Sequence, residues 1–464
     1  MTASNALLVT IDSLRVDHCS GMGYERETTP TLDAVADDGL SFAQAIANGP
    51  STRSSFPSIL TSTYPLMYGG YTYLSEERPF LARTFSEAGF DTAAFHSNPH
   101  VGAPQNYDTG FDTFNDTAEG SDEVASLKDR VERVLDPDSF LYRLLRRGYH
   151  MFTMATDSAA YARADTINEN AIEWLDERAG SEDPFFLWVH YMDVHYPFQP
   201  PDEYMTELGL DPLSNRRVAD LNGRMHEDPE SFDESDREDL LKLYDAEIRY
   251  TDDRIGDLLD HLDSLGVRDD TAVAVCADHG EAFGEHGRYG HHPFLYDELL
   301  RVPFVVDAPD LDAADLPDEG DTQVELLDIG PTLYDLTGVE TPEAVQGESV
   351  RDAVDDDGER IAISASSGND VVAENVDEWK YFACRTPDWK CFWRVADEEV
   401  ELYDLDADPG ETRDVSHENP ETVERLRGHI EAHLEDARAT ELDLPDVEKS
   451  EEVKQRLRDL GYKA

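Results

Sequence analysis

Short apolar runs recur along most of the chain, and glycine, proline or charged residues bound them. Their length and their content of β-branched residues are typical of strands that are buried on both faces of a sheet. We predict such strands at residues 6–11, 90–95, 185–189, 271–276 and 302–306. Helical patterns lie between these strands, so the sequence indicates an open α/β sheet.

Between the apolar runs, hydrophobic residues repeat at the spacing of amphipathic helices, and Pro30 stands in the first turn of one of them. The predicted helices cover residues 29–36, 120–180 and 239–265, and another begins at Val324. Within the second of these, residues 120–160 are predicted to form a helical insertion of no obvious chemistry. Residues 201–236 are polar and contain proline, so we predict a loop there.

After about residue 355 the pattern changes to closely spaced strands, which we predict at 377–383, 389–395 and 401–405. Amphipathic helices follow them to the end of the chain. We therefore divide the chain into a large domain, 1–355, and a C-terminal subdomain, 356–464. The length of 464 residues suits two or three domains.

Polar side chains follow three of the predicted strands directly. Asp278 and His279 come after 271–276, Asp12 comes after 6–11, and His190, Asp193 and His195 come after 185–189. Ligands bind at the carboxyl ends of strands in open α/β sheets, and carboxylate with imidazole suits a metal. Each residue also has a simpler reading, as a turn residue, a helix cap or a core histidine. Their occurrence at three strand ends favours a site.

Residues 48–61 are rich in hydroxyl groups and lead into a short predicted helix. Backbone N–H groups at such a helix start would face an anion. For Ser51, Ser54 and Ser55 taken singly, we prefer the reading as ordinary N-cap residues.

The composition is strongly acidic, with a formal net charge of -64 and seven lysines among 38 basic residues. Dispersed acidity with few lysines is typical of proteins kept soluble in high salt, as in halophiles. A disordered acidic chain is excluded because 39% of residues are apolar and periodic. Nucleic-acid binding is disfavoured because no basic stripe is present.

Cys19, Cys276, Cys384 and Cys391 have spacings that fit neither a zinc motif nor a disulfide framework. The N-terminus lacks the basic region and long apolar core of a signal peptide, and no run approaches a membrane span. We expect a cytoplasmic protein without a membrane span.

Several segments, taken in order, resemble the sulfatase family within the alkaline phosphatase superfamily. They are Thr10–His18, the loop to Thr61, His190–Pro197, Asp278–His286, Arg301–Pro303, Asp328–Thr332 and Glu401–Glu411. The resemblance covers nearly the whole chain. It implies a doubly wound α/β domain with a mostly parallel sheet, a small C-terminal α+β domain, and a divalent metal beside a nucleophile.

The chain departs from the family pattern at the nucleophile. The family has Cys or Ser, any residue, Pro, any residue, Arg, and oxidises the first residue to formylglycine. Alignment on Leu60-Thr61 places Thr52 at that position, Ser54 at the proline and Phe56 at the arginine. Threonine cannot yield the formylglycine aldehyde. Lysines of the family's anion cage are also absent, and His286, His291 or His292 stands where one would be.

The resemblance implies a role for each matching residue. Asp12, Thr52, Asp278 and His279 would surround one metal, for which Mn, Zn and Ca are the candidates. Thr52 would be the nucleophile, activated by that metal. Arg53 would clamp the anion, and His195 would be a leaving-group acid or a second-metal ligand with His190 and Asp193 nearby.

Three functions remain open at this point. The first is hydrolysis of sulfate or phosphate esters of a small molecule or glycan. The second is transfer of the phospho group to a glycan or lipid head group. The third is an inactive, sulfatase-shaped binding protein, against which the retained metal ligands argue. The sequence leaves the oligomeric state open.

Overall fold

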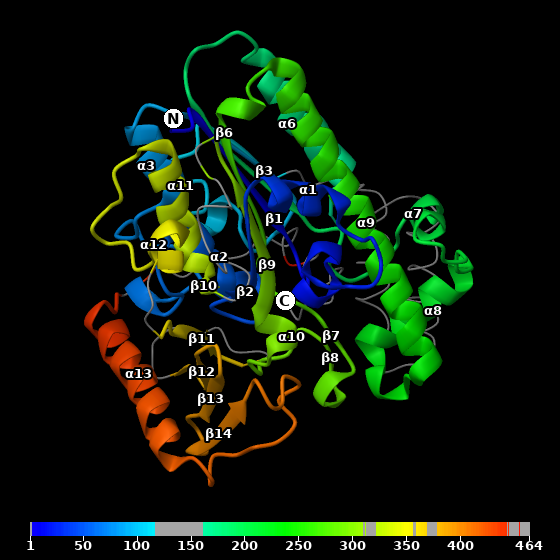
Figure 1. Ribbon diagram of the computed structural model, residues 1–464, viewed down its shortest axis with the longest axis vertical. Coiled ribbons are helices and arrows are strands. Elements are labelled where there is room, and N and C mark those ends of the chain that lie inside the picture. Colours follow the sequence, from blue (N-terminus) through cyan, green and yellow to red (C-terminus); the bar gives the residue numbers. More distant parts are fainter. Residues whose placement is uncertain are drawn as a thin grey trace.

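A computed structural model describes residues 2–116, 161–309, 311, 322–355, 359–368, 378–442, 444 and 454 of the chain. Its centre is an eight-stranded sheet in the order β10-β2-β9-β6-β1-β5-β3-β4, with helices on both faces (Figure 1). A separate four-stranded sheet lies below it in the same view. The predicted fold class, a doubly wound α/β sheet with a small C-terminal α+β part, is confirmed.

The strands of the large sheet are mostly parallel. They are β1 (Asn5–Ile11), β2 (Leu40–Ile46), β3 (Asp91–His96), β4 (Thr113–Asp116), β5 (Phe185–Tyr191), β6 (Thr271–Ala277), β9 (Arg301–Asp307) and β10 (Gln323–Glu325). Only β9 runs antiparallel to its neighbours, β2 and β6, among the strands described. The five predicted strands correspond to β1, β3, β5, β6 and β9. An apolar run does not reveal the direction of a strand, so the sequence did not predict that β9 is antiparallel.

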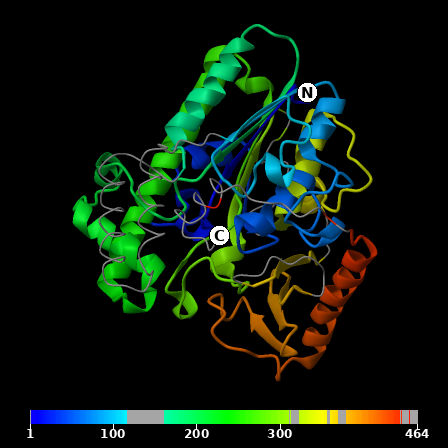
Figure 2. The same cartoon turned by 180° about the vertical axis from the view of Figure 1, so that it is seen from behind.

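The helices form a layer on each face of this sheet (Figure 1, Figure 2). One layer consists of α1 (Pro30–Asp38), α6 (Ala164–Glu177) and α9 (Glu234–Leu265), and the other of α2 (Thr52–Thr61), α3 (Leu81–Glu87), α11 (Ile329–Thr337) and α12 (Val350–Asp355). The first layer carries α7 (Asp202–Glu207) and α8 (Asn215–Glu227) beside α9. A short hairpin of β7 (Ala282–Phe283) and β8 (Tyr289–Gly290) and the short α10 (Asp297–Leu300) follow β6.

Two predictions about local structure are wrong. Residues 201–236 are not loop but contain α7, α8 and the start of α9. These helices are polar, and α8 is tied to α9 by ion pairs such as that from Arg217 Nη1 to Asp236 Oδ1, 2.7 Å apart. Side-chain caps at Ser214 and Asp233 begin α8 and α9. Because ion pairs and caps replace an apolar stripe, hydrophobic periodicity misses them.

The second wrong prediction is the helix beginning at Val324. Residues Gln323–Glu325 form the edge strand β10, paired with β2, and a capping box of Glu325 and Asp328 then leads to α11. Of the predicted helix over 120–180, α6 is present, whereas the insertion at 120–160 lies outside the described residues.

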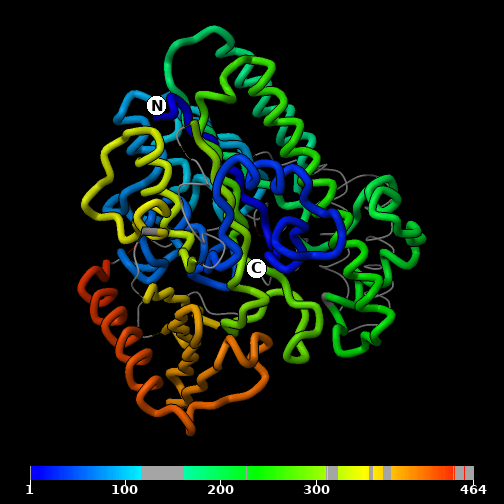
Figure 3. Tube along the Cα trace, viewed as in Figure 1, coloured from blue at the N-terminus to red at the C-terminus, as the bar shows by residue number. Residues whose placement is uncertain are grey.

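The C-terminal part is an antiparallel sheet covered by one helix. Its strands are β11 (Ala362–Ser366), β12 (Tyr381–Arg385), β13 (Trp389–Arg394) and β14 (Glu399–Asp404), in that order, and the helix is α13 (Pro420–Ala439). Leu426 and Ile430 of α13 share one hydrophobic core with Leu402 of the sheet, and all three are fully buried. The trace in Figure 3 shows this part, orange to red, as one lobe beside the large sheet. The boundary at residue 355 stays a prediction.

A largely buried ionic cluster joins the C-terminal sheet to α10, which precedes β9. Lys390 Nζ of β13 lies 2.8 Å from Asp297 Oδ1 and 2.9 Å from Glu411 Oε1. Arg385 Nη2 of β12 lies 3.0 Å from Asp297 Oδ2. The Asp297 carboxylate at the start of α10 therefore receives two cations from the C-terminal sheet.

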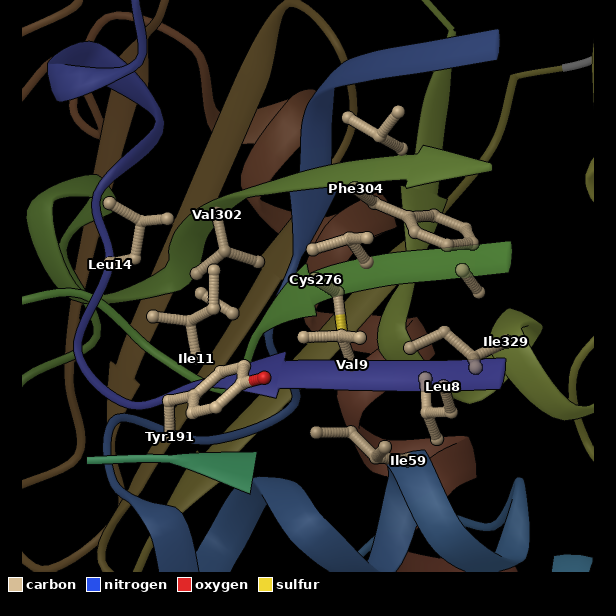
Figure 4. Packing of buried hydrophobic residues seen from close by; sticks show 14 of the residues in the cluster. Leu8, Val9, Ile11, Leu14, Ile59, Tyr191, Cys276, Val302, Phe304 and Ile329 are labelled. Carbon is tan, nitrogen blue, oxygen red and sulfur yellow. The ribbon is translucent and has the colours of Figure 1, made fainter. Parts of the chain in front are cut away.

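The core lies around β1, every residue of which is buried. Leu8 and Val9 of β1 are fully buried, and Ile59 of α2, Cys276 of β6 and Ile329 of α11 lie against this strand (Figure 4). The four cysteines are buried free thiols. In the described part of the chain, no helix combines the length and hydropathy that a bilayer span requires.

Candidate active site

Adjacent parallel strands bring the predicted site residues to one edge of the sheet. Ile11 pairs with Ala277 on one side and with Tyr191 on the other. The ladder continues one residue further, where Asp278 N donates to Ile11 O (3.3 Å) and Asp12 N donates to Tyr191 O (2.9 Å). Asp12 and Asp278 therefore leave neighbouring strands side by side.

Asp12, Asp278 and His279 form a fully buried cluster whose ligand atoms all lie within 4.8 Å of one another. His279 Nε2 is 3.5 Å from Asp12 Oδ1 and 3.6 Å from Asp278 Oδ2. Its Nδ1 lies 2.8 Å from Gly280 O, which fixes the proton on Nδ1 and leaves the Nε2 lone pair facing the carboxylates. Two carboxylates and an imidazole so arranged fit a divalent cation.

The electrostatics of Asp12 and Asp278 also favour a divalent cation at this cluster. Burial opposes ionisation of Asp12, but His195, His190 and His279 outweigh it and hold the Asp12 pKa far below its usual value. Burial and the Asp12 charge raise the pKa of Asp278 well above its usual value. Without a cation, the pair therefore carries one negative charge, and Asp278 Oδ2 has no hydrogen-bond partner among the residues that the structure describes. A divalent cation would stabilise both carboxylates in the ionised form.

Thr52 is the first residue of α2, and its side chain points into this cluster. Its Oγ1 lies 3.3 Å from Asp12 Oδ2 and 3.4 Å from His279 Nε2, and the residue is 1% exposed. Ser51 points elsewhere, since its Oγ lies 3.1 Å from Ser54 Oγ. Ser51 occupies the N-cap position of α2, as predicted, but its side chain makes no capping hydrogen bond.

Asn98, which follows β3, is a site residue that the sequence did not single out. Its Nδ2 donates to Asp12 Oδ2 (2.9 Å) and lies 3.4 Å from His190 Nε2. His190 lies inside β5, not at its tip, and its Nδ1 is 2.9 Å from Thr10 Oγ1. Asn98 and His190 thus contact Asp12 at Oδ2, the oxygen to which Thr52 Oγ1 also donates. The only signal for Asn98 was its place after a predicted strand.

A second cluster of His195, His291 and Glu281 adjoins the first. His291 Nε2 lies 2.9 Å from His195 Nε2, and His291 Nδ1 lies 3.3 Å from Glu281 Oε1. The His291 ring is 4.6 Å from that of His279. Burial lowers the pKa of His195 to about 4 and that of His291 to about 3, and burial raises the pKa of Glu281 to about 7. His195 thus stands where predicted, with His291 as its partner.

Other predicted residues lie outside these two clusters. His292 Nε2 is 3.7 Å and His286 Nδ1 is 2.9 Å from Glu298 Oε1, towards the C-terminal sheet. Asp193 pairs with Arg163, whose Nε is 2.9 Å from Asp193 Oδ1. Arg53 follows Thr52, and its guanidinium lies 5.1 Å from the centre of the Tyr71 ring. Of the histidines proposed to replace a lysine, only His291 contacts His195.

Comparisons of the sequence with family models and with known proteins agree on one family. The sequence matches the family model described as Sulfatase over residues 4–339, and the model described as N-sulphoglucosamine sulphohydrolase, C-terminal, over residues 284–440. It is 25% identical over 450 residues to the ulvan-active sulfatase of Formosa agariphila, covering 93% of this chain and 80% of the relative.

Solved structures share the fold. A protein in complex with its substrate D-glucosamine-2-N,6-O-disulfate aligns with a TM-score of 0.69 at 19% identity, covering 96% of this chain and 100% of the other. The phosphonate monoester hydrolase of Silicibacter pomeroyi aligns with a TM-score of 0.67 at 21% identity, covering 95% of this chain and 96% of the other.

Proposed function

Because the chain belongs to the sulfatase family and is a sulfuric ester hydrolase of the alkaline phosphatase superfamily, we propose that it cleaves its ester with Thr52 as the nucleophile. One observation carries this proposal: Thr52 Oγ1 is the hydroxyl that contacts both Asp12 and His279 in the buried cluster. The sequence position that the family gives to formylglycine thus coincides with the hydroxyl that points at the metal ligands.

Asp12, Asp278 and His279 would hold a divalent metal beside Thr52, with Mn, Zn and Ca as candidates. When bound, such a metal supplies positive charge that lowers the pKa of a nearby hydroxyl and offsets charge on the ester oxygens. Asn98 and His190 keep Asp12 oriented for this task through the contacts described above.

The residues support a two-step reaction. Thr52 Oγ1 attacks the sulfur or phosphorus atom, its proton leaves along the hydrogen bond to Asp12, and the bond to the leaving oxygen breaks. The leaving oxygen takes a proton through His195 and His291 from Glu281, whose raised pKa of about 7 lets it hold one near neutral pH. Water then cleaves the Thr52 ester and restores the hydroxyl. Arg53, one residue away, would help to hold the anion if its side chain turns from Tyr71.

The organic part of the substrate is proposed to be a sugar. The ulvan-active relative and the neighbour solved with a sulfated glucosamine support this assignment. A phosphate or phosphonate ester is the second candidate, because Thr52 retains a single hydroxyl and a phosphonate monoester hydrolase shares the fold. The sulfate group and the phosphate or phosphonate group are both tetrahedral oxyanions, so the same site could bind either of them.

The test compares Thr52→Ala with the matched control Ser51→Ala. Purified protein, supplied with Mn, Zn or Ca, is assayed on 4-nitrophenyl sulfate, a phosphate monoester and a phosphate diester. We expect Thr52→Ala to lower kcat by about a thousandfold or more, since only binding and electrostatic contributions remain. Ser51→Ala should change little, and Thr52→Ser should retain much of the activity. A Thr52→Ala variant with wild-type turnover would refute the nucleophile.

A further inference from the structure

A cavity of about 740 Å³ lies at the loop that follows His195 in the chain, outside every residue assigned above to catalysis. Its wall combines the residues before α6, the loop around Pro200, α7, the start of α8 and the middle of α9. Figure 1 shows α7 and α8 standing beside α9. A cavity of this volume suits a ligand of sugar size or somewhat larger.

The cavity opens at the same edge of the sheet as the catalytic cluster. Residues 161–166 enter α6, which runs from that edge back to the start of β5, so its first turn lies near the carboxyl ends of the strands. Gln199 lines the cavity four residues after His195. Four residues span at most about 14 Å, which is roughly the length of a di- or trisaccharide.

The chemistry of the lining matches a sugar ring. Met205 and Leu243, 1% exposed each, form an apolar floor with Val218. Tyr204 and Tyr250, with ring centres 5.2 Å apart, add aromatic edges. Hydrogen-bonding groups line the exposed rim: Asp165, Thr166, Gln199, Asp202, Glu203 and Asn215. An apolar floor fits the C–H face of a pyranose, and the rim fits its hydroxyls.

The charges of the lining exclude an anionic ligand. Both arginines of the wall already have carboxylate partners. Arg163 Nη2 is 3.0 Å from Glu247 Oε2, and its Nε pairs with Asp193. Arg254 Nη1 is 3.0 Å from Asp257 Oδ2. The exposed carboxylates of the rim would repel a sulfate or uronate group.

We propose that this cavity is a subsite for a neutral, hydroxyl-rich sugar unit of the substrate, remote from the ester that is cleaved. The proposal rests on the proposed function, because it takes the organic part of the substrate to be a glycan. It makes the preferred substrate an oligosaccharide whose sulfated unit occupies the catalytic cluster and whose neutral unit occupies the cavity. The enzyme would then recognise a neighbouring sugar as well as the ester itself.

Two variants fill the cavity and one serves as control. Val218→Trp and Leu213→Trp each place an indole in the wall, and Arg216→Trp places the same ring on the exposed side of α8. Binding of maltose, cellobiose, lactose and xylobiose is measured by saturation-transfer NMR. Spermidine and glucuronate are included as cationic and anionic probes. Hydrolysis of 4-nitrophenyl sulfate reports the catalytic site separately.

We expect at least one neutral disaccharide to bind wild type and the control, and to bind both cavity variants at least tenfold more weakly. Hydrolysis of the aryl sulfate should stay within twofold in all three variants. The proposal fails if no disaccharide binds wild type, if binding survives both cavity substitutions, or if only a charged probe binds. If the aryl ester and both phosphate esters are not cleaved while disaccharide binding behaves as expected, the proposed function fails and the subsite stands.

Discussion

Two buried carboxylates face each other at the ends of β1 and β6, and their repulsion has a measurable effect. In protein stripped of metal by chelation, Asp278→Asn should raise the free energy of unfolding at pH 7 by roughly 1–3 kcal/mol. Burial and the Asp12 charge keep Asp278 neutral in the folded chain, so wild type must take up a proton on folding, whereas asparagine is neutral in both states. Added Mn should then raise the melting temperature of wild type and leave that of the variant unchanged. Thermal unfolding with and without Mn, followed by elemental analysis, measures both effects.

Asp269→Asn is the matched control, since this exposed residue lies just before the opposite end of β6. It should behave as wild type in both conditions. Equal metal stabilisation of wild type and Asp278→Asn would remove Asp278 from the ligand set.

At this scale the sequence predicted the residues whose chemistry is distinctive. Asp12, Thr52, Asp278 and His279 were predicted together and lie together. Asn98 and Glu281 were not predicted, because an amide after a strand and a glutamate after a glycine are common in surface turns. Their importance comes from three-dimensional contacts with Asp12 and His291.

At the scale of elements, α13 contains a buried histidine that makes its packing sensitive to pH. His433 packs edge-on against Tyr64, with ring centres 4.6 Å apart, and burial lowers its pKa to about 4. Between pH 6.5 and 4 the unfolded chain binds a proton at this residue that the native chain does not. Stability contributed by the neutral His433 is therefore fully present above pH 6.5 and is lost as the pH falls.

His433→Leu removes this titration. Between pH 7 and pH 5, wild type should lose about 2 kcal/mol more unfolding free energy than the variant, as measured by urea unfolding at constant salt. His429→Leu, on the exposed side of the same helix, should lose as much as wild type. An equal loss in wild type and His433→Leu would show that His433 does not titrate in this way.

Apolar elements were predicted well and polar ones poorly. The strands of the large sheet bury both faces, so their sequence is a continuous apolar run. By contrast, α8 and the beginning of α9 are held by Arg217, Asp233 and Asp236. Ion pairs and caps of this kind leave no hydrophobic period to detect. The strand β10 is three residues long, too short for an alternation to be seen.

At the scale of the whole molecule, the net charge of -64 is expected to control how stability depends on salt. Between molar and millimolar KCl, the midpoint of thermal unfolding should fall by roughly 10 °C or more, because screening of the mutual repulsion is lost. Differential scanning calorimetry across a KCl series measures the effect. Sucrose, which is uncharged and excluded from protein surfaces, should not restore the high-salt midpoint. A midpoint independent of salt would contradict the prediction of a halophilic protein.

The ionic cluster of Asp297, Arg385 and Lys390 limits how this protein can change by recombination. A crossover after residue 355 that brings a C-terminal sheet without cations at positions 385 and 390 would leave the largely buried carboxylate of Asp297 without these cationic partners. Removing the partner of a buried charge costs about 3–5 kcal/mol. Asp297 and the sheet that faces it must therefore be inherited together. The segments before and after residue 355 are not interchangeable modules.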